Sequence, residues 1–221
     1  MNDANQKEIF LRTEGDAWFA RNPAPSAGAS DHVDDAIAAY AMGSRSVLEV
    51  GCADGRRLSN LLDCLQGTVE AVGIDPSSEA IRVGKERHPR LDLRIGTADA
   101  LPVDKTFDTV LIGFCLYLCD RNLLARIVSE VDRVLRDGGS LVIIDFDPPT
   151  PRRRAYRHAT GVWSYKMDYS TIFTALPHFV LAAKTSMSHQ SAEWTDDERE
   201  RIAVWLIKKD LRGGYSEESD S

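Results

Sequence analysis

The stretch that most constrains the fold runs from Ser46 to Leu58 and reads Ser-Val-Leu-Glu-Val-Gly-Cys-Ala-Asp-Gly-Arg-Arg-Leu. It opens with a short apolar run that is typical of a buried parallel strand. A turn follows whose small residues are Gly51, Ala53 and Gly55, and glycine there permits positive φ and close approach of a ligand to the backbone. Leucines at helical spacing come next. This order of strand, glycine turn and helix predicts the opening unit of a nucleotide-binding α/β domain.

The spacing of the small residues separates two classes of nucleotide site. The dinucleotide fingerprint G-x-G-x-x-G requires glycine where this chain has Ala53 and Arg56, so an NAD-dependent enzyme is the less favoured interpretation. The chain instead has G-x-A-x-G, with the acidic Glu49 two residues before the first glycine. A second acid, Asp75, ends the next predicted strand at about the spacing, roughly 20 residues, that lets a carboxylate reach a ribose.

Five segments in chain order resemble the motifs of class I methyltransferases that use S-adenosylmethionine. They are the glycine loop after Glu49, the second strand end Ile74–Ser77, the adenine loop Gly96–Pro102, the fourth strand Phe107–Tyr117, and the turn with the fifth strand, Leu135–Asp145. The resemblance implies an α/β fold, a Rossmann-like three-layer sandwich with a mostly parallel seven-stranded sheet and an antiparallel edge strand. It also implies an enzyme, a methyltransferase, with S-adenosyl-L-methionine as its cofactor.

The resemblance assigns the cofactor contacts residue by residue. It implies that Asp75 accepts hydrogen bonds from the ribose hydroxyls, that Asp99 accepts from the adenine amine, and that the Ala100 amide serves the ring nitrogen. Two alternatives stay open: Asp75 as an N-cap, in competition with Ser77, and Asp99 as a solvated turn residue. The expected cofactor set is Glu49, Gly51, Cys52, Ala53, Gly55, Asp75, Pro76, Asp99, Ala100, Gly113 and Phe114.

Periodicity and breaker residues divide the chain into five parts. We expect an N-terminal helical segment over 1–44, a cofactor-binding core over 45–147, an acceptor-recognition insertion over 148–176, C-terminal strands over 177–211, and a disordered tail over 212–221. The first predicted helix, over 4–22, is either a lid on the site or a helix packed on the flank of the sheet. The C-terminal strands, over 179–188 and 201–209, are expected to pair antiparallel at the sheet edge.

The insertion is rich in arginine within an acidic chain of net charge −7. Guanidinium groups pair bidentately with phosphate or carboxylate, so we expect a small anionic acceptor such as a sugar or nucleotide-linked sugar. A solvated basic face is the alternative. The expected acceptor-binding set is Tyr117, Arg152, Arg154, Arg157, Tyr165 and Lys166.

A hydroxyl acceptor needs a general base, whereas a nitrogen acceptor need not have one. Phe114 stands where many relatives have a histidine, so that base is absent. The remaining candidates are Asp147, His158 and Asp168, with Asp145 in a supporting role. Asp168 has the alternative role of capping a short helix over 169–175.

Composition excludes several other functions. The net charge of −7 disfavours a nucleic-acid partner, and no apolar run approaches the roughly 18 residues that span a membrane. The N-terminus lacks a signal-peptide pattern, so a cytoplasmic protein is expected. The four cysteines show no metal-ligand spacing, so no metal is expected. The alternative function is a non-catalytic S-adenosylmethionine-binding partner subunit.

Overall fold

The computed structural model describes residues 5–22 and 32–216, and its largest element is one seven-stranded sheet. The strands lie in the order β3-β2-β1-β4-β5-β9-β8. Their bounds are β1 Ser46–Val50, β2 Glu70–Asp75, β3 Asp92–Ile95, β4 Phe107–Gly113, β5 Leu135–Phe146, β8 Phe179–Ser188 and β9 Arg201–Lys209. A separate hairpin pairs β6 (Arg152–Ala155) with β7 (Trp163–Lys166).

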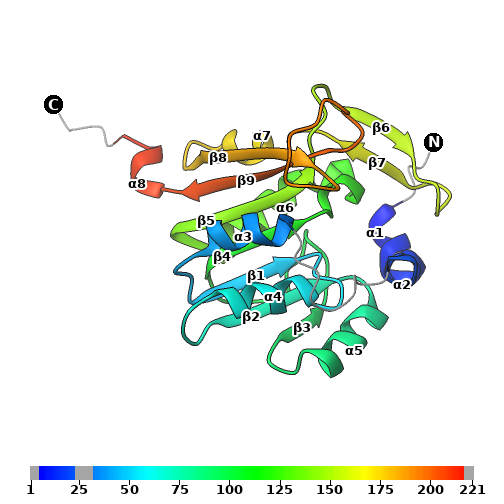
Figure 1. The fold of residues 1–221 in the computed structure, drawn as a ribbon, viewed down its shortest axis with the longest axis horizontal. Helices are drawn as coiled ribbons and strands as arrows, with labels where there is room; N and C mark the ends of the chain where they lie inside the picture. The colour runs from blue at the N-terminus through cyan, green and yellow to red at the C-terminus, as the bar shows by residue number, and fades with distance from the viewer. Residues whose placement is uncertain (1–4, 23–31, 217–221) are drawn as a thin grey trace.

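The helices cover both faces of the sheet and one of its edges (Figure 1). Their bounds are α1 Gln6–Ile9, the π-helix η1 Phe10–Glu14, α2 Gly15–Arg21, α3 His32–Ala41, α4 Arg56–Cys64, α5 Ser78–Arg87, the 3₁₀ turns η2 Leu116–Leu118 and η3 Arg121–Leu123, α6 Leu124–Val134, α7 Ser170–Thr174 and α8 Leu211–Gly214. Apolar residues of α3, α4 and α5 form one core with the sheet, and those of α6 and α7 form a second core on its other face.

This architecture confirms the predicted three-layer α/β fold with a mostly parallel seven-stranded sheet. The antiparallel strand is β9, which lies one place in from the edge because β8 adds outside it. Since β8 and β5 both run antiparallel to β9, β8 runs in the same direction as the parallel strands. The carboxyl end of β8 therefore lies on the same side of the sheet as the carboxyl ends of β1, β2, β4 and β5.

Two local predictions differ from the structure. The turn expected at the start of Leu135–Asp145 is part of β5 instead: α6 ends at Val134, and Leu135 is buried in β5 opposite Phe107. The Asp-Gly-Gly sequence after it is a bulge within β5, where Gly138 has a φ of 73°. The tail expected to be disordered from residue 212 instead contains the end of α8, and its last residues, 217–221, lie outside the described residues.

The cap of α5 decides between the two roles considered for Asp75. The Ser77 hydroxyl accepts a hydrogen bond from the Ala80 amide at 3.0 Å, so Ser77 is the N-cap. This leaves the Asp75 carboxylate directed toward the ends of the strands.

Within residues 5–22 and 32–216, no helix is both long enough and apolar enough to cross a membrane. The same residues contain no group of three or more His, Cys, Asp or Glu side chains that is placed to hold a metal ion.

Candidate active site

A cavity of about 600 Å³ lies at the carboxyl ends of the parallel strands. Its walls come from the loops after β1, β2 and β4, from the end of β5, from the N-terminal helical segment and from the residue after β8. Ligands of open α/β sheets bind outside this edge. The cavity therefore occupies the position at which the sequence predicted a nucleotide site.

The loop after β1 is shaped by two residues with positive φ. Gly51 has a φ of 78° and Ala53 a φ of 49°. A Cβ atom added to Gly51 would lie 2.8 Å from Cβ of Cys115, closer than real contacts permit. The Gly51 amide donates to the Ile74 carbonyl at 2.8 Å, which ties the loop to the end of β2.

Asp75 is held by backbone donors on two sides. Its Oδ2 accepts from the Ala53 amide and its Oδ1 from the Ser77 amide, both at 2.8 Å. Burial raises the pKa of Asp75 to about 6, although both of these hydrogen bonds oppose the shift. The carboxylate is thus fixed on the cavity wall and is ionised at pH 8.

Glu49 is fully buried at the cavity wall, and neither of its carboxylate oxygens has a hydrogen-bond partner among the described residues. Nη1 of Arg57 lies 3.5 Å from Oε1. Burial raises the pKa of Glu49 to about 7, which the charge of Arg57 partly offsets. A buried carboxylate without full pairing is costly, so this position favours a cationic ligand group beside it.

Asp99 lies on the cavity wall and is paired with a residue from the N-terminal segment. Its Oδ2 accepts from Nζ of Lys7 at 2.7 Å, and this contact helps to hold the pKa of Asp99 below its usual value, while burial acts in the opposite direction. The Ala100 amide donates to the Thr97 carbonyl at 3.1 Å instead of facing the cavity. The assignment of that amide to an adenine nitrogen is therefore not supported, because a local turn uses it.

Most of the expected cofactor set is brought together by the fold. Every member lines the cavity except Gly55 and Ala100. Gly55 is the N-cap of α4, and its backbone packs against leucine side chains. Contact of these residues with a ligand stays a prediction.

Aromatic side chains form the part of the cavity next to β4 and β5. The Phe146 ring lies 5.8 Å from Phe114 and 5.2 Å from Tyr117, both in edge-to-face geometry. Phe114 has a φ of 49°, an uncommon conformation that turns its ring into this cluster. His189 adds a ring 5.4 Å from Phe114. We name Phe114, Tyr117, Phe146 and His189 the aromatic cluster.

Sequence reasoning missed Phe146 and His189, whereas Trp18 belongs to the helix considered as a lid. The signal for His189 was available, since it directly follows the strand predicted over 179–188. Phe146 lies between Asp145 and Asp147, and the sequence pattern favoured these two aspartates as the functional residues of the strand end. The indole of Trp18 lines the cavity together with Tyr117.

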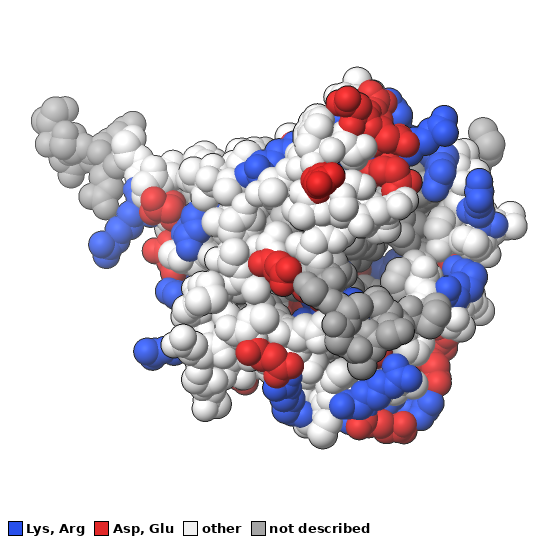
Figure 2. Space-filling view, viewed as in Figure 1, with Lys and Arg blue, Asp and Glu red and all other residues white. Residues whose placement is uncertain are grey.

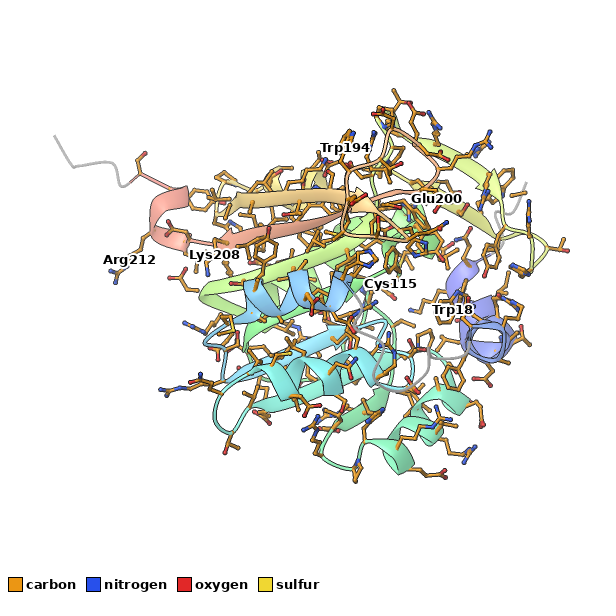
Figure 3. All side chains as sticks on the ribbon, in the orientation of Figure 1. Trp18, Cys115, Trp194, Glu200, Lys208 and Arg212 are labelled. Carbon is orange, nitrogen blue, oxygen red and sulfur yellow. The ribbon has the colours of Figure 1, made fainter. Side chains whose placement is uncertain are left out.

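The N-terminal helical segment, residues 6–21, closes one side of the cavity. Figure 3 shows Trp18 on α2 opposite the region beyond β4 where Cys115 lies, and both side chains line the cavity. The amides of Gln6 and Lys7 donate to the Asp120 carboxylate at 3.0 and 2.9 Å. These contacts support the lid interpretation over a helix packed on the flank of the sheet.

Removing the carboxylate of Asp16 is expected to loosen this segment. Oδ1 of Asp16 accepts from the Ser77 hydroxyl at 2.7 Å and from the Glu79 amide at 3.0 Å, which joins α2 to the first turn of α5. In Asp16→Ala we expect hydrogen exchange over residues 6–21 to accelerate by about tenfold, as expected for a local opening that becomes easier by about 1.4 kcal/mol. Asp63→Ala, which removes an exposed ion pair with Arg90, is the control. Unchanged exchange in Asp16→Ala would contradict the assignment.

The three predicted catalytic residues lie away from the cavity. Asp147 is bound by Nζ of Lys184 at 2.8 Å and by the Ser186 hydroxyl at 2.9 Å. Asp168 accepts from the Ser170 amide at 2.9 Å and contacts the same lysine at 3.3 Å. His158 is exposed.

Strand alternation explains why Asp147 does not reach the site. Successive side chains of a strand point to opposite faces, so Asp145 and Asp147 share the face of α6, whereas Phe146 points toward the cavity. Burial raises the pKa of Asp145 to about 7, but its oxygens accept from the amides of Tyr117 and Phe146. These positions give no support to the catalytic roles predicted for Asp147, His158 and Asp168.

The predicted acceptor residues divide among three places. Tyr117 lines the cavity, and burial raises its pKa, so it stays protonated at neutral pH. Arg154 and Arg157 are exposed and do not line the cavity. The other three line a separate hollow of about 240 Å³ beside the β6–β7 hairpin, namely Arg152, Tyr165 and Lys166.

The structure does not bring the arginines of the hairpin to the cavity, and their role at an acceptor site stays a prediction. Figure 2 shows Lys, Arg, Asp and Glu side chains intermixed over this end of the molecule, and Arg152 pairs with Glu198. Arg154 and Arg157 are exposed to solvent, in agreement with the solvated basic face considered as the alternative.

Comparison with known proteins places this site in context. Residues 47–139 match a family described as a methyltransferase domain. A demethylmenaquinone methyltransferase from Renibacterium salmoninarum is 36% identical over 121 residues, which are 48% of this chain and 49% of that protein. A ubiquinone/menaquinone biosynthesis C-methyltransferase UbiE from Geobacter sp. is 32% identical over 117 residues, 49% of this chain and 48% of its own length. The chain spans about half the length of these curated relatives.

Solved structures share the fold over almost the whole chain. The N-methyltransferase NodS from Bradyrhizobium japonicum, in complex with S-adenosylhomocysteine, aligns with a TM-score of 0.63 at 19% identity and covers 95% of this chain and 99% of its own. A Burkholderia thailandensis 1,6-didemethyltoxoflavin-N1-methyltransferase aligns with a TM-score of 0.68 at 16% identity, over 94% of this chain and 88% of its own. At these identities the likeness establishes the fold.

Proposed function

We propose that this chain, whose residues 47–139 form a class I S-adenosylmethionine-dependent methyltransferase domain, transfers a methyl group from that cofactor to a small acceptor with a planar, largely apolar ring. The observation that carries the proposal is the pair of carboxylates on the cavity wall, Asp75 and Glu49, beside a loop that leaves room at its backbone.

The residues present fit the cofactor. Asp75 is fixed by two amides and offers its remaining lone pairs to ribose hydroxyls. The buried Glu49 carboxylate, which has no hydrogen-bond partner among the described residues, matches the ammonium of the methionine moiety. When bound, S-adenosylmethionine supplies a methyl group that is activated by its positively charged sulfur. The protein needs only to orient the acceptor toward that methyl group and to manage its proton.

The aromatic cluster supports a planar acceptor over the anionic sugar expected from the sequence. Its rings offer edges and faces to a flat molecule, and the arginines of the insertion do not line this cavity. The curated relatives are named for demethylmenaquinone and for C-methylation. We therefore take the reduced ring of a demethylmenaquinone as the specific acceptor. A non-catalytic partner role has no observation in its favour among the described residues.

The test is methyl transfer to defined acceptors. The protein is incubated with methyl-labelled S-adenosylmethionine and a reduced, short-chain demethylmenaquinone, and the product is analysed by mass spectrometry. UDP-glucuronate is the parallel anionic acceptor. Label on a ring carbon of the quinol supports the proposal; label on the sugar, or on neither compound with the cofactor bound, would reject the proposed acceptor.

Arg157→Ala is expected to leave transfer to the quinol within about twofold of the wild type at low and high salt. Its side chain is exposed and does not line the cavity, and exposed charges are screened within about 10 Å at 0.1 M salt. Kinetics at two ionic strengths check this. A salt-dependent loss of affinity in this variant would restore the anionic-acceptor interpretation.

A further inference from the structure

His189 lines the cavity and comes from the end of β8, the outermost strand of the sheet next to β9. It directly follows β8, whose carboxyl end lies at the ligand edge because β8 runs parallel to β1 and β5. The sheet register places Phe146 opposite Ile202, and Ile202 opposite Met187, two residues before His189. The His189 amide donates to the Glu200 carbonyl at 2.7 Å, which fixes the backbone at this point.

The imidazole of His189 belongs to the aromatic cluster. Its ring lies 5.4 Å from Phe114 and 6.1 Å from Phe146. Within residues 5–22 and 32–216, its ring nitrogens form neither a hydrogen bond nor an ion pair. The fold therefore presents an uncommitted proton-exchanging group in the part of the cavity assigned to the acceptor.

The other protic groups on the cavity wall are committed or unsuited to this role. Lys7 and Asp99 pair with each other, and Asp120 accepts from two amides at the start of the N-terminal segment. Burial raises the pKa values of Tyr117 and Cys115, so both remain protonated at neutral pH. Glu49 and Asp75 belong to the first two strands and are assigned to the cofactor. Imidazole is the side chain that readily exchanges a proton near neutral pH.

We propose that His189 is the general base of methyl transfer, an inference that rests on the proposed function. A ring nitrogen of His189 takes the proton of the acceptor hydroxyl, and the O–H electron pair stays on the acceptor. The electron-rich ring carbon then forms a bond to the methyl group, whose bond to sulfur breaks with its electron pair on sulfur. The proton on that carbon then leaves to solvent, and the His189 imidazolium returns its proton to the ring oxygen, which restores the aromatic quinol. The balance is one quinol and one S-adenosylmethionine to one methylquinol, one S-adenosylhomocysteine and one proton.

Charged groups lie beside the aromatic cluster to which His189 belongs. The guanidinium of Arg57, from α4, lies 6.0 Å from the Phe114 ring centre, and Nζ of Lys166, from β7, lies 3.2 Å from that of Phe146. The Glu200 carboxylate accepts from the side chain of Gln190 at 3.2 Å. The two cations favour the anionic acceptor, and Glu200 opposes them. Burial and Arg154 lower the pKa of Lys166 to about 8, so its contribution fades in more alkaline solution.

The experiment compares the wild type with His189→Gln, His189→Ala and the control His88→Gln, which changes a histidine at the end of α5. In the complex with S-adenosylhomocysteine, the redox-stable probe 1-naphthol is titrated with pH, and its ionised form is followed by absorbance. We expect His189→Gln to need a pH at least one unit higher for half-ionisation of the bound probe. We expect kcat toward the reduced demethylmenaquinone to fall about 100-fold, as general bases typically contribute, with KM for the cofactor within twofold. Added imidazole should partly restore His189→Ala.

The outcomes separate the two proposals. If the wild type methylates the quinol and His189→Gln does so within threefold, with an unshifted naphthol titration, the role of His189 is refuted and the proposed function stands. If the wild type binds S-adenosylhomocysteine but methylates no quinol, the proposed acceptor fails and the base assignment fails with it. Normal S-adenosylhomocysteine affinity and thermal stability in every variant exclude misfolding as the cause of a lower kcat.

Discussion

Asp75→Ala is expected to weaken binding of S-adenosylhomocysteine by at least about 100-fold while the protein stays folded. The Asp75 carboxylate accepts from the amides of Ala53 and Ser77, so its position on the cavity wall is fixed before a ligand arrives. Hydrogen bonds to a charged group are worth about 1.5–3 kcal/mol each, and two ribose hydroxyls make two of them. Isothermal titration calorimetry at pH 8 measures the loss.

The pH dependence and a control variant sharpen this prediction. Because burial raises the pKa of Asp75 to about 6, the ionised acceptor is present above that pH, and affinity should fall as the pH is lowered through 6. Asp92→Asn, which alters an exposed carboxylate paired with Arg94 on the neighbouring β3, should bind as the wild type does. Wild-type affinity in Asp75→Ala would remove the basis of the proposed cofactor site.

The cofactor half of the site was predictable because its determinants are local in sequence. The run from β1 through the glycine loop to α4 specifies its own backbone, and Asp75 follows from the end of the next buried strand. Parallel strands then bring their carboxyl ends to one edge, so motifs far apart in the chain meet without further information. The same local strand patterns predicted the mostly parallel sheet.

The acceptor half was less predictable because it depends on which way side chains point and on long-range packing. Asp147 sits at the correct strand end but on the opposite face from Phe146, and one residue of register decides between them. The arginines of β6 are correctly placed in the sequence after β5, yet the hairpin turns them toward solvent and Glu198. Asp99 pairs with Lys7, which is 92 residues away in the sequence, and no local pattern predicts this contact.

Glu49→Gln is expected to stabilise the protein at pH 8 while weakening its ligand. The pKa of Glu49 is raised from 4.5 to about 7 by burial, so above pH 7 the folded protein carries a buried charge that the unfolded chain solvates better. This destabilisation is complete above pH 7 and fades as the pH falls from 7 toward 4.5. The amide should therefore raise the free energy of unfolding by on the order of 3 kcal/mol at pH 8 and by little near pH 4.5. Arg57 keeps a partner in the variant, because its Nε lies 3.0 Å from Oδ1 of Asp34.

The ligand comparison gives this prediction its specificity. S-adenosylhomocysteine carries the ammonium that Glu49 is proposed to face, whereas adenosine has the same base and ribose without it. Glu49→Gln should therefore lose affinity for S-adenosylhomocysteine by about tenfold or more and retain its affinity for adenosine. A single substitution that raises stability and lowers affinity shows that the charge serves ligand binding. Replacing a purely structural carboxylate would produce neither effect. Equal losses for the two ligands, or lower stability at both pH values, would assign Glu49 to the scaffold instead.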